Sequence, residues 1–359
     1  MTSSRQILSN ADQSAWSALE ASLRLSWSAL DHADAWPNEQ LEACGDCGVF
    51  AWFMPREWGG LGWSEVELLR GYLRLSKACL TTAFVLTQRV AAVSRIVACE
   101  KASLQRELLP RLLTAETFAT VGISHLTTSH RHVARPILTA TPHSTGFVLE
   151  GFSPWVTGAN QAETIVVGAT LTDGRQLLAA VDTKSTGVRI RPAERLVALS
   201  ASQTGRVDFQ QVEVPLDRVL AGPVESVMKH GLAAGTGGLT TSTLAIGLAD
   251  RALEILSQEA ERRADLEPPT VALREEWDAL RDDLLALAED RPVCTAETIR
   301  QRANDLALRA SQAALMATKG AGFVASHPAG RLCREALFFL VWSCPQPVTS
   351  AHLCELAGL

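Results

Sequence analysis

Residues 163–182 read ETIVVGATLTDGRQLLAAVD, and this stretch decides the fold class. Two runs of β-branched and other apolar residues flank the dipeptide Asp173-Gly174. Both central positions of a tight hairpin turn favour a positive φ, and this dipeptide tolerates such a backbone. The stretch therefore predicts two antiparallel strands joined by a hairpin turn.

Short strand-like runs continue on both sides of this hairpin, from Thr117 to about Gly222. They read FATVGIS, ARPILTATP, GFVLEG, TGVRIRPAERL and GRVDFQQVEVP, and turn residues separate them. No helical pattern lies between them, and consecutive strands without intervening helices usually pair antiparallel. The middle of the chain therefore predicts an antiparallel β-barrel or sandwich.

Helical patterns occupy both flanks of this β region. Before it, Trp16, Leu19 and Leu23 recur at helical spacing, and Ser64 with Glu67 three residues later matches a capping box. Residues 78–97 form a further apolar helix. After it, residues 238–263 predict a long helix with small residues that allow close backbone approach, and two more helices follow.

The predicted fold class is therefore α+β, with a helical bundle, a β-barrel or sandwich and a second helical bundle in that order. We expect an N-terminal helical domain over residues 1–115, a middle β domain over 116–222 and a C-terminal helical domain over 223–359.

Composition and charge exclude some classes of function. The chain has 359 residues, and 33 Lys and Arg against 39 Asp and Glu give a net charge of -6, which lacks the basic footprint of a nucleic-acid-binding protein. Polar residues interrupt the apolar run 78–97, so no membrane span is predicted. The start of the chain lacks a signal-peptide pattern, and the expectation is a cytoplasmic protein with reduced cysteines.

Several short motifs fall in the order found in the acyl-CoA dehydrogenase family, and the chain resembles that family over nearly its whole length. The motifs are MPREWGGLG at residues 54–62, PWVT at 154–157, VDFQQVEVP at 207–215, Arg263, KGAGF at 319–323 and REA at 334–336. The α-β-α order is also that of the family.

This resemblance implies an FAD cofactor. Trp155 would lie against the flavin ring, the Thr157 hydroxyl would bond its N5 edge, and Ser124 would donate to the pyrimidine side. Arg263 would reach the cofactor pyrophosphate from a neighbouring subunit, because a guanidinium offers paired donors to phosphate. Gly320 and Gly322 would let the backbone approach the adenosine part.

One departure concerns the catalytic base. The resemblance places a glutamate where this chain has Ser343, and the family's alternative position, near residues 236–240, holds no carboxylate either. A serine without a partner base cannot remove a proton from the carbon next to a thioester. Glu335, His352 and Glu355 are the candidate replacements.

A second departure is a histidine-containing segment after Ser124. His130 and His132 are compatible with a metal pair or a proton shuttle, or with an exposed loop. Because no carboxylate or cysteine nearby completes a site, no metal is predicted.

The first interpretation is an FAD-dependent oxidoreductase that oxidises the Cα–Cβ bond of an acyl-CoA or acyl-carrier thioester, with Ser343 at the position of the usual base. The alternatives are a flavin-dependent monooxygenase on the same fold, which needs no such base, and a non-catalytic member that binds an acyl thioester or a partner protein. A homodimer or homotetramer is expected, and the electron acceptor is left open.

Overall fold

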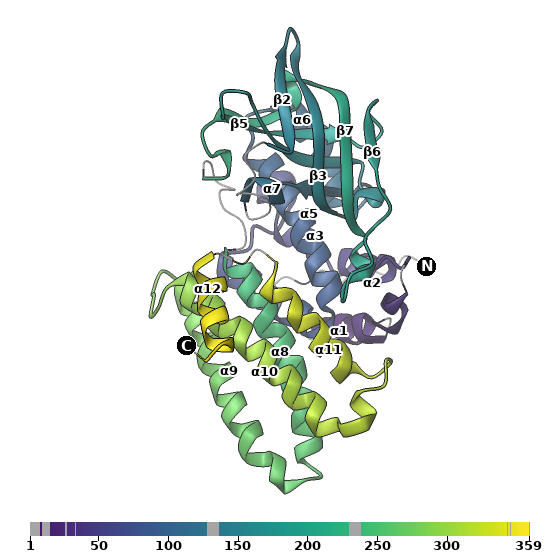
Figure 1. Ribbon diagram of the computed structural model, residues 1–359. Helices are drawn as coiled ribbons and strands as arrows, with labels where there is room; N and C mark the ends of the chain where they lie inside the picture. Colours follow the sequence, from purple (N-terminus) through teal and green to yellow (C-terminus); the bar gives the residue numbers. More distant parts are fainter. Residues whose placement is uncertain are drawn as a thin grey trace, which may run out of the picture.

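The computed structural model describes residues 8, 15–25, 27–32, 34–127, 136–229, 238–342, 344 and 346–358. The predicted order of helices, strands and helices is confirmed (Figure 1). Helices precede the sheet as α1 (Ala15–Leu25), α2 (Asn38–Asp46), α3 (Val49–Trp52), α4 (Glu65–Ala78), α5 (Leu80–Ala98) and α6 (Ala102–Leu113). Helices follow it as α8 (Gly238–Ala260), α9 (Glu267–Ala288), α10 (Ala296–Gly322), α11 (Pro328–Ala336) and α12 (Gln346–Leu356).

The middle of the chain forms one sheet with the short helix α7 (Ser124–Thr127) attached. Its strands are β1 (Ala119–Gly122), β2 (Leu138–His143), β3 (Gly146–Thr157), β4 (Thr164–Thr170), β5 (Gln176–Asp182), β6 (Val188–Ile190), β7 (Thr204–Pro215) and β8 (Val219–Val224). They follow the order β6-β7-β3-β2-β4-β5-β8, and β1 pairs with β4.

The sheet is mixed rather than purely antiparallel. β1 and β2 both run parallel to β4, whereas the other pairs are antiparallel as predicted. A parallel pair needs a long connection. The chain between β1 and β4 supplies one, because it includes the β2–β3 hairpin, and such a pairing leaves no local pattern in the sequence.

The hairpin between β4 and β5 is confirmed, but its turn is longer than expected. The strands pair up to Thr170 and Gln176, and the Gly174 N–H donates to the Leu171 oxygen. Only Gly174 has a positive φ, 87°, whereas Asp173 does not share this conformation. A longer loop of this kind needs one left-handed residue rather than two.

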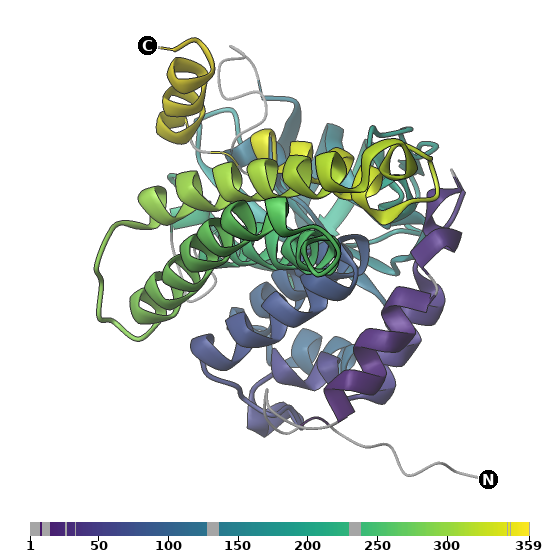
Figure 2. The ribbon, with the colours of Figure 1, turned by 90° about the horizontal axis from the view of Figure 1, so that it is seen from below.

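The helices of the two flanks share a core. α4 lies against α8, where the Ser76 hydroxyl donates to the Leu244 oxygen at 2.6 Å. A Cβ on Gly247 would stand 2.6 Å from the Leu73 oxygen, so this approach requires a glycine, as predicted for the start of the long helix. Figure 2 shows the C-terminal helices as a layer beside the N-terminal ones.

Helix α5 lies between the sheet and the helices (Figure 1) and contacts β1, α4, α6 and α8. By length and composition it is long and apolar enough to cross a membrane, but 67% of that window is buried inside the molecule. The core of the protein therefore takes up most of its apolar surface. The Ser64–Glu67 capping box before α4 is confirmed. The division into three domains by residue range stays a prediction.

A buried ion-pair network joins α11 to the N-terminal helices. Arg331 Nε lies 2.8 Å from Glu335 Oε1, and its Nη1 reaches Asp31 at 3.2 Å and the Trp27 oxygen at 2.7 Å. Its Nη2 also donates to the Thr81 hydroxyl at 3.3 Å. The guanidinium thus connects α11 to the segment before α2 and to the start of α5.

Candidate active site

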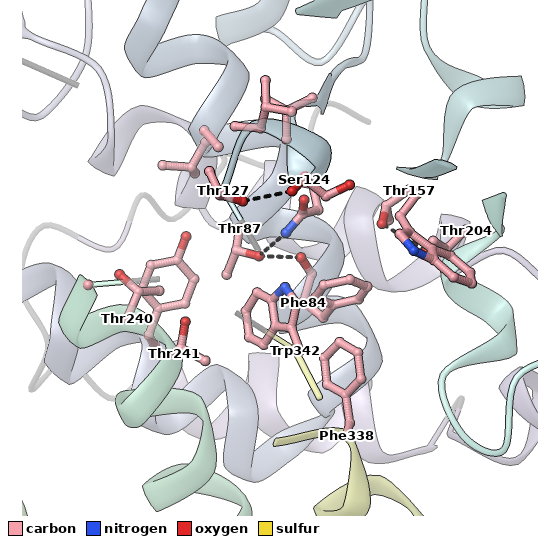
Figure 3. Close-up of a pocket in the computed structure, with 18 of the residues that line it drawn as sticks. Phe84, Thr87, Ser124, Thr127, Thr157, Thr204, Thr240, Thr241, Phe338 and Trp342 are labelled. Atoms are coloured by element: carbon pink, nitrogen blue, oxygen red, sulfur yellow. Dashed lines mark hydrogen bonds between the residues drawn. The ribbon is translucent and has the colours of Figure 1, made fainter. Parts of the chain in front are cut away.

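A cavity of about 1070 Å³ lies where the sheet, α4, α5, the start of α8 and the segment after α11 meet (Figure 3). Each of the three predicted parts of the chain contributes to its wall. Such a volume is typical of a site for a large small molecule or for a cofactor together with a substrate.

Three of the predicted site residues line this cavity together, on its sheet side. Trp155 and Thr157 come from the end of β3, and Ser124 begins α7 just after β1. The Trp155 side chain is 46% exposed, which is unusual for a tryptophan next to a core. The wall therefore offers a free aromatic face next to two hydroxyl groups.

The two hydroxyl groups differ in their partners. The Thr157 hydroxyl lies 2.8 Å from that of Thr204, which lies 2.8 Å from that of Ser202. The Ser124 Oγ atom is buried and has no hydrogen-bond partner among the described residues. A buried polar atom without a partner costs free energy, and a ligand can supply the missing bond. The Trp155 face and these donors fit a flat, conjugated ring with hydrogen-bond acceptors on its edge.

Aromatic side chains form another wall of the cavity. The rings of Phe338 and Trp342 stack at 5.1 Å, and Phe84 of α5 meets each of them edge-on at 4.9 and 5.0 Å. Arg300 Nη2 donates to the Trp342 oxygen at 2.7 Å, and Asn304 Nδ2 donates to the Phe339 oxygen at 3.0 Å. These two α10 side chains fix the backbone that carries the aromatic wall. Burial lowers the pKa of Arg300 to about 10.

Ionisable groups are sparse around the cavity. Of the described residues that line it, Glu65 is the one carboxylate, and Arg95 and Arg334 are the cations. Glu65 is exposed at the start of α4. Burial lowers the pKa of Arg95 to about 10. Ser343 lies outside the described residues, as do residues 236 and 237, both His130 and His132, and the side chain of Glu355, whereas residues 238–240 begin α8 and include no carboxylate.

Neither Glu335 nor His352, the other described candidate bases, lines this cavity. Glu335 lines a smaller cavity of about 500 Å³, where it is ion-paired with Arg331. Burial is the largest influence on the Glu335 carboxyl and raises its pKa, and the Arg331 guanidinium opposes this shift. His352 is buried on α12 and lines neither cavity. The described residues include no group of three side chains placed to hold a metal ion.

Arg263, Gly320 and Gly322 are not brought to either cavity. Arg263 Nη1 donates to the Ala317 oxygen at 2.8 Å, and its Nε lies 3.8 Å from Asp265. A Cβ on Gly322 would stand 2.0 Å from the Thr318 hydroxyl oxygen, which explains a glycine there by packing alone. Within one chain Arg263 and Gly322 therefore help to order the end of α10, whereas a Cβ on Gly320 would meet no atom within 4 Å.

Two helix faces complete the cavity and were not predicted. α4 contributes Glu65, Leu68, Leu69 and Tyr72, and α5 contributes residues that include Thr87, Gln88, Ala91 and Ser94. Their helical spacing is visible in the sequence. Spacing alone, however, does not distinguish a face that lines a cavity from one that packs in the core.

The N-terminal part of the chain matches a family model. Residues 12–116 match the model described as acyl-CoA dehydrogenase, N-terminal domain. The chain is also 21% identical over 328 residues to a probable acyl-CoA dehydrogenase, YngJ, of Bacillus subtilis, and the match covers 86% of each chain.

Solved structures share the fold over nearly the whole length. A glutaryl-CoA dehydrogenase from Mycobacterium smegmatis in complex with FADH2 superimposes with a TM-score of 0.79 at 16% identity, over 97% of this chain and 96% of that one. A dibenzothiophene monooxygenase from Paenibacillus sp. A11-2 gives a TM-score of 0.76 at 14% identity, over 96% and 95%. At such identities the likeness shows the fold alone.

Proposed function

Because the chain belongs to the acyl-CoA dehydrogenase family, we propose that it is an FAD-dependent oxidoreductase that oxidises the Cα–Cβ bond of an acyl thioester. CoA or a carrier protein presents this thioester. The observation that carries the proposal is the convergence of Ser124, Trp155 and Thr157 on one wall of the large cavity. An exposed indole beside buried hydroxyl groups suits a flavin ring.

The residues of this wall have separate roles. When bound, the flavin supplies the hydride acceptor. The Trp155 ring covers one face of the site and keeps water away from it, and the Ser124 hydroxyl donates to the ring edge. Thr157 also donates to this edge. Ser202 can donate to the Thr204 oxygen and Thr204 to the Thr157 oxygen, and the Thr157 proton is then free to bond the ring.

The substrate must lose a proton from Cα, and the described cavity offers little to remove it. Glu65 is the one carboxylate among the described lining residues, and it is exposed. By the register of the family motif, Ser343 stands where the base belongs. We therefore propose that proton removal from an unactivated acyl thioester is slow in this protein.

The second candidate function is a flavin-dependent monooxygenase. The same shortage of carboxylates favours it, because such a reaction needs no base for an α-proton. The fold is also shared with a dibenzothiophene monooxygenase. Six aromatic side chains line the cavity and suit a flat apolar substrate, namely Phe53, Tyr72, Phe84, Trp155, Phe338 and Trp342.

We also propose a homodimer or homotetramer in which Arg263, Gly320 and Gly322 hold the pyrophosphate and adenosine of a neighbour's cofactor. Large apolar side chains near the end of α10 support an interface there, since Met316 is 78% exposed and Phe323 85%. Light scattering with Phe323→Glu tests it. A dimer or tetramer that dissociates on this change supports the interface, and an unchanged oligomer contradicts it.

The cytoplasm is the proposed location. All eight cysteines are free thiols in the structure, as expected of a protein in a reducing compartment. The electron acceptor is left open.

The visible spectrum of the purified protein, with identification of any flavin released on denaturation, tests the proposed function. Bound FAD supports the dehydrogenase-like proposal, and FMN or loosely held flavin favours the monooxygenase. A colourless protein that does not take up added FAD contradicts both and leaves a non-catalytic member of the family.

A further inference from the structure

Tyr72 is the single tyrosine of the chain, and it lines the large cavity from α4. The side chain is 3% exposed, and its ring packs against Phe53 with the centroids 5.2 Å apart. Its hydroxyl is buried and has no hydrogen-bond partner among the described residues. Burial raises the pKa of Tyr72, so the phenol keeps its proton.

The surroundings make this hydroxyl stand out. The cavity wall formed by α4 and α5 is largely apolar and includes Leu68, Leu69 and Ala91. The buried Arg89 guanidinium interacts electrostatically with Tyr72, but it forms no hydrogen bond with the phenol. Two polar α5 side chains of the same cavity, Thr87 and Gln88, are hydrogen-bonded to each other. The Thr87 hydroxyl donates to the Phe84 oxygen at 2.6 Å and accepts from Gln88 Nε2 at 2.9 Å (Figure 3).

A hydrocarbon chain bound in this cavity would form no hydrogen bond with the Tyr72 hydroxyl. The hydroxyl would therefore add nothing to the affinity for such a ligand. A phenylalanine would pack in the same space without the desolvation cost of a hydroxyl group. A ligand oxygen would satisfy the hydroxyl, and a site built in this way discriminates between ligands that carry the oxygen and ligands that lack it.

We propose that the acyl group taken up by this cavity carries an oxygen, as a hydroxyl or carbonyl group on its chain, and that Tyr72 donates a hydrogen bond to it. This inference rests on the proposed function, since it places an acyl thioester in the cavity. It adds a substrate class, namely hydroxyacyl or oxoacyl thioesters rather than plain saturated ones.

Binding measurements on the whole purified protein test this inference. The probes are a saturated acyl-CoA and the hydroxyacyl- and oxoacyl-CoAs of the same length, with the oxygen at successive carbons. Dissociation constants come from isothermal titration calorimetry. We expect the wild type to bind at least one oxygenated thioester about 3- to 10-fold more tightly than the saturated one. Tyr72→Phe should lose this preference and keep its affinity for the saturated thioester.

Ser94→Ala is the matched control, because it removes a different hydroxyl from the same cavity. It should keep the preference. Tyr72→Phe should also melt no lower than the wild type, since it removes a hydroxyl without a partner. An equal preference in Tyr72→Phe and wild type overturns the inference, as does a lower melting temperature, which would reveal a structural partner for the phenol.

Flavin content, measured on the same samples, separates this inference from the proposed function. A protein without flavin contradicts the proposed function. A flavin-containing protein that binds oxygenated and saturated thioesters equally well contradicts the Tyr72 inference alone.

Discussion

The hydroxyl groups of Thr157 and Thr204 lie 2.8 Å apart at the cavity end of the β3–β7 pair, where these two residues are direct partners in the ladder. Ser202 extends the chain of hydroxyls by one further bond. Each hydroxyl donates one hydrogen, so the direction of the chain decides whether Thr157 has a proton to offer a ligand. Strand register thus controls a donor in the proposed flavin site.

The first prediction concerns this series of hydrogen-bonded hydroxyl groups. Thr204→Val removes its middle member, so Thr157 loses the partner that orients its hydroxyl. We expect flavin affinity to fall about 3- to 10-fold, with Thr157→Val at least as strongly affected. Titration of flavin-free protein followed by flavin fluorescence measures this. Unchanged affinity in both variants would show that the hydroxyl chain has no part in cofactor binding.

The second prediction separates structure from chemistry at Glu335. Glu335→Gln leaves the Arg331 guanidinium buried with a weaker partner, and breaking a buried pair typically costs about 3 to 5 kcal/mol in the free energy of unfolding. Denaturant unfolding measures this loss. The slow flavin reduction expected of the wild type should not change per folded molecule, because Glu335 does not line the large cavity. A reduction rate abolished by this change would identify Glu335 as the base.

The third prediction is a pH dependence at Asp208 of β7. Burial alone would raise the pKa of this carboxyl. Hydrogen bonds from Arg206 and Arg191 lower the pKa by more than burial raises it, so the net shift is downward. The ionised carboxylate therefore stabilises the fold above the pKa of an unfolded aspartate, about 3.9, and the contribution is lost as the pH falls through the lower folded value.

Asp208→Asn should accordingly lower the free energy of unfolding by roughly 1 to 2 kcal/mol near neutral pH. The difference from the wild type should shrink as the pH falls below about 4. Melting curves at several pH values measure it. A difference that stays constant down to pH of about 3 would contradict the ionised pair.

Much of the fold could be predicted because its signals are local. Helical spacing around Trp16 and Leu19, the capping box at Ser64 and the β-branched runs each depend on neighbouring residues. The parallel pairing of β1 with β4 could not be predicted, since it joins segments far apart in the sequence. The turn at Asp173-Gly174 was predicted too short because its length depends on the strand register.

The family motifs predict three residues that line the large cavity, and their roles toward a cofactor stay a prediction. Trp155, Thr157 and Ser124 were placed by the register of the family resemblance, and the structure brings them to one wall. Tyr72 was missed because its α4 face reads as ordinary core in the sequence. Arg263 is predicted to reach a neighbour's cofactor, and within one chain its guanidinium bonds the Ala317 oxygen and lies near Asp265.

The fourth prediction concerns Ser343, by its position in the family motif. Anaerobic addition of saturated acyl-CoAs should bleach the visible absorbance of the wild-type flavin very slowly or not at all. General-base catalysis typically increases a rate by a factor of roughly 10² to 10⁴. Ser343→Glu should therefore bleach faster than the wild type, by a factor of up to about this size. Ser343→Gln, of similar size but without a base, is the matched control. Rapid bleaching of the wild type would instead show that another residue serves as base, and Glu65→Gln would be examined first.

The central claim is that a flavin binds against Trp155, and the flavin content of Trp155→Ala tests it most directly. The measurement compares moles of flavin per mole of folded protein in the wild type, in Trp155→Ala and in Leu216→Ala, a control at an apolar residue that is 56% exposed and outside both cavities. The account predicts about one FAD per chain in the wild type and in the control, and a loss of most of it in Trp155→Ala. Full FAD content in Trp155→Ala, or no flavin in the wild type even after incubation with FAD, would contradict it.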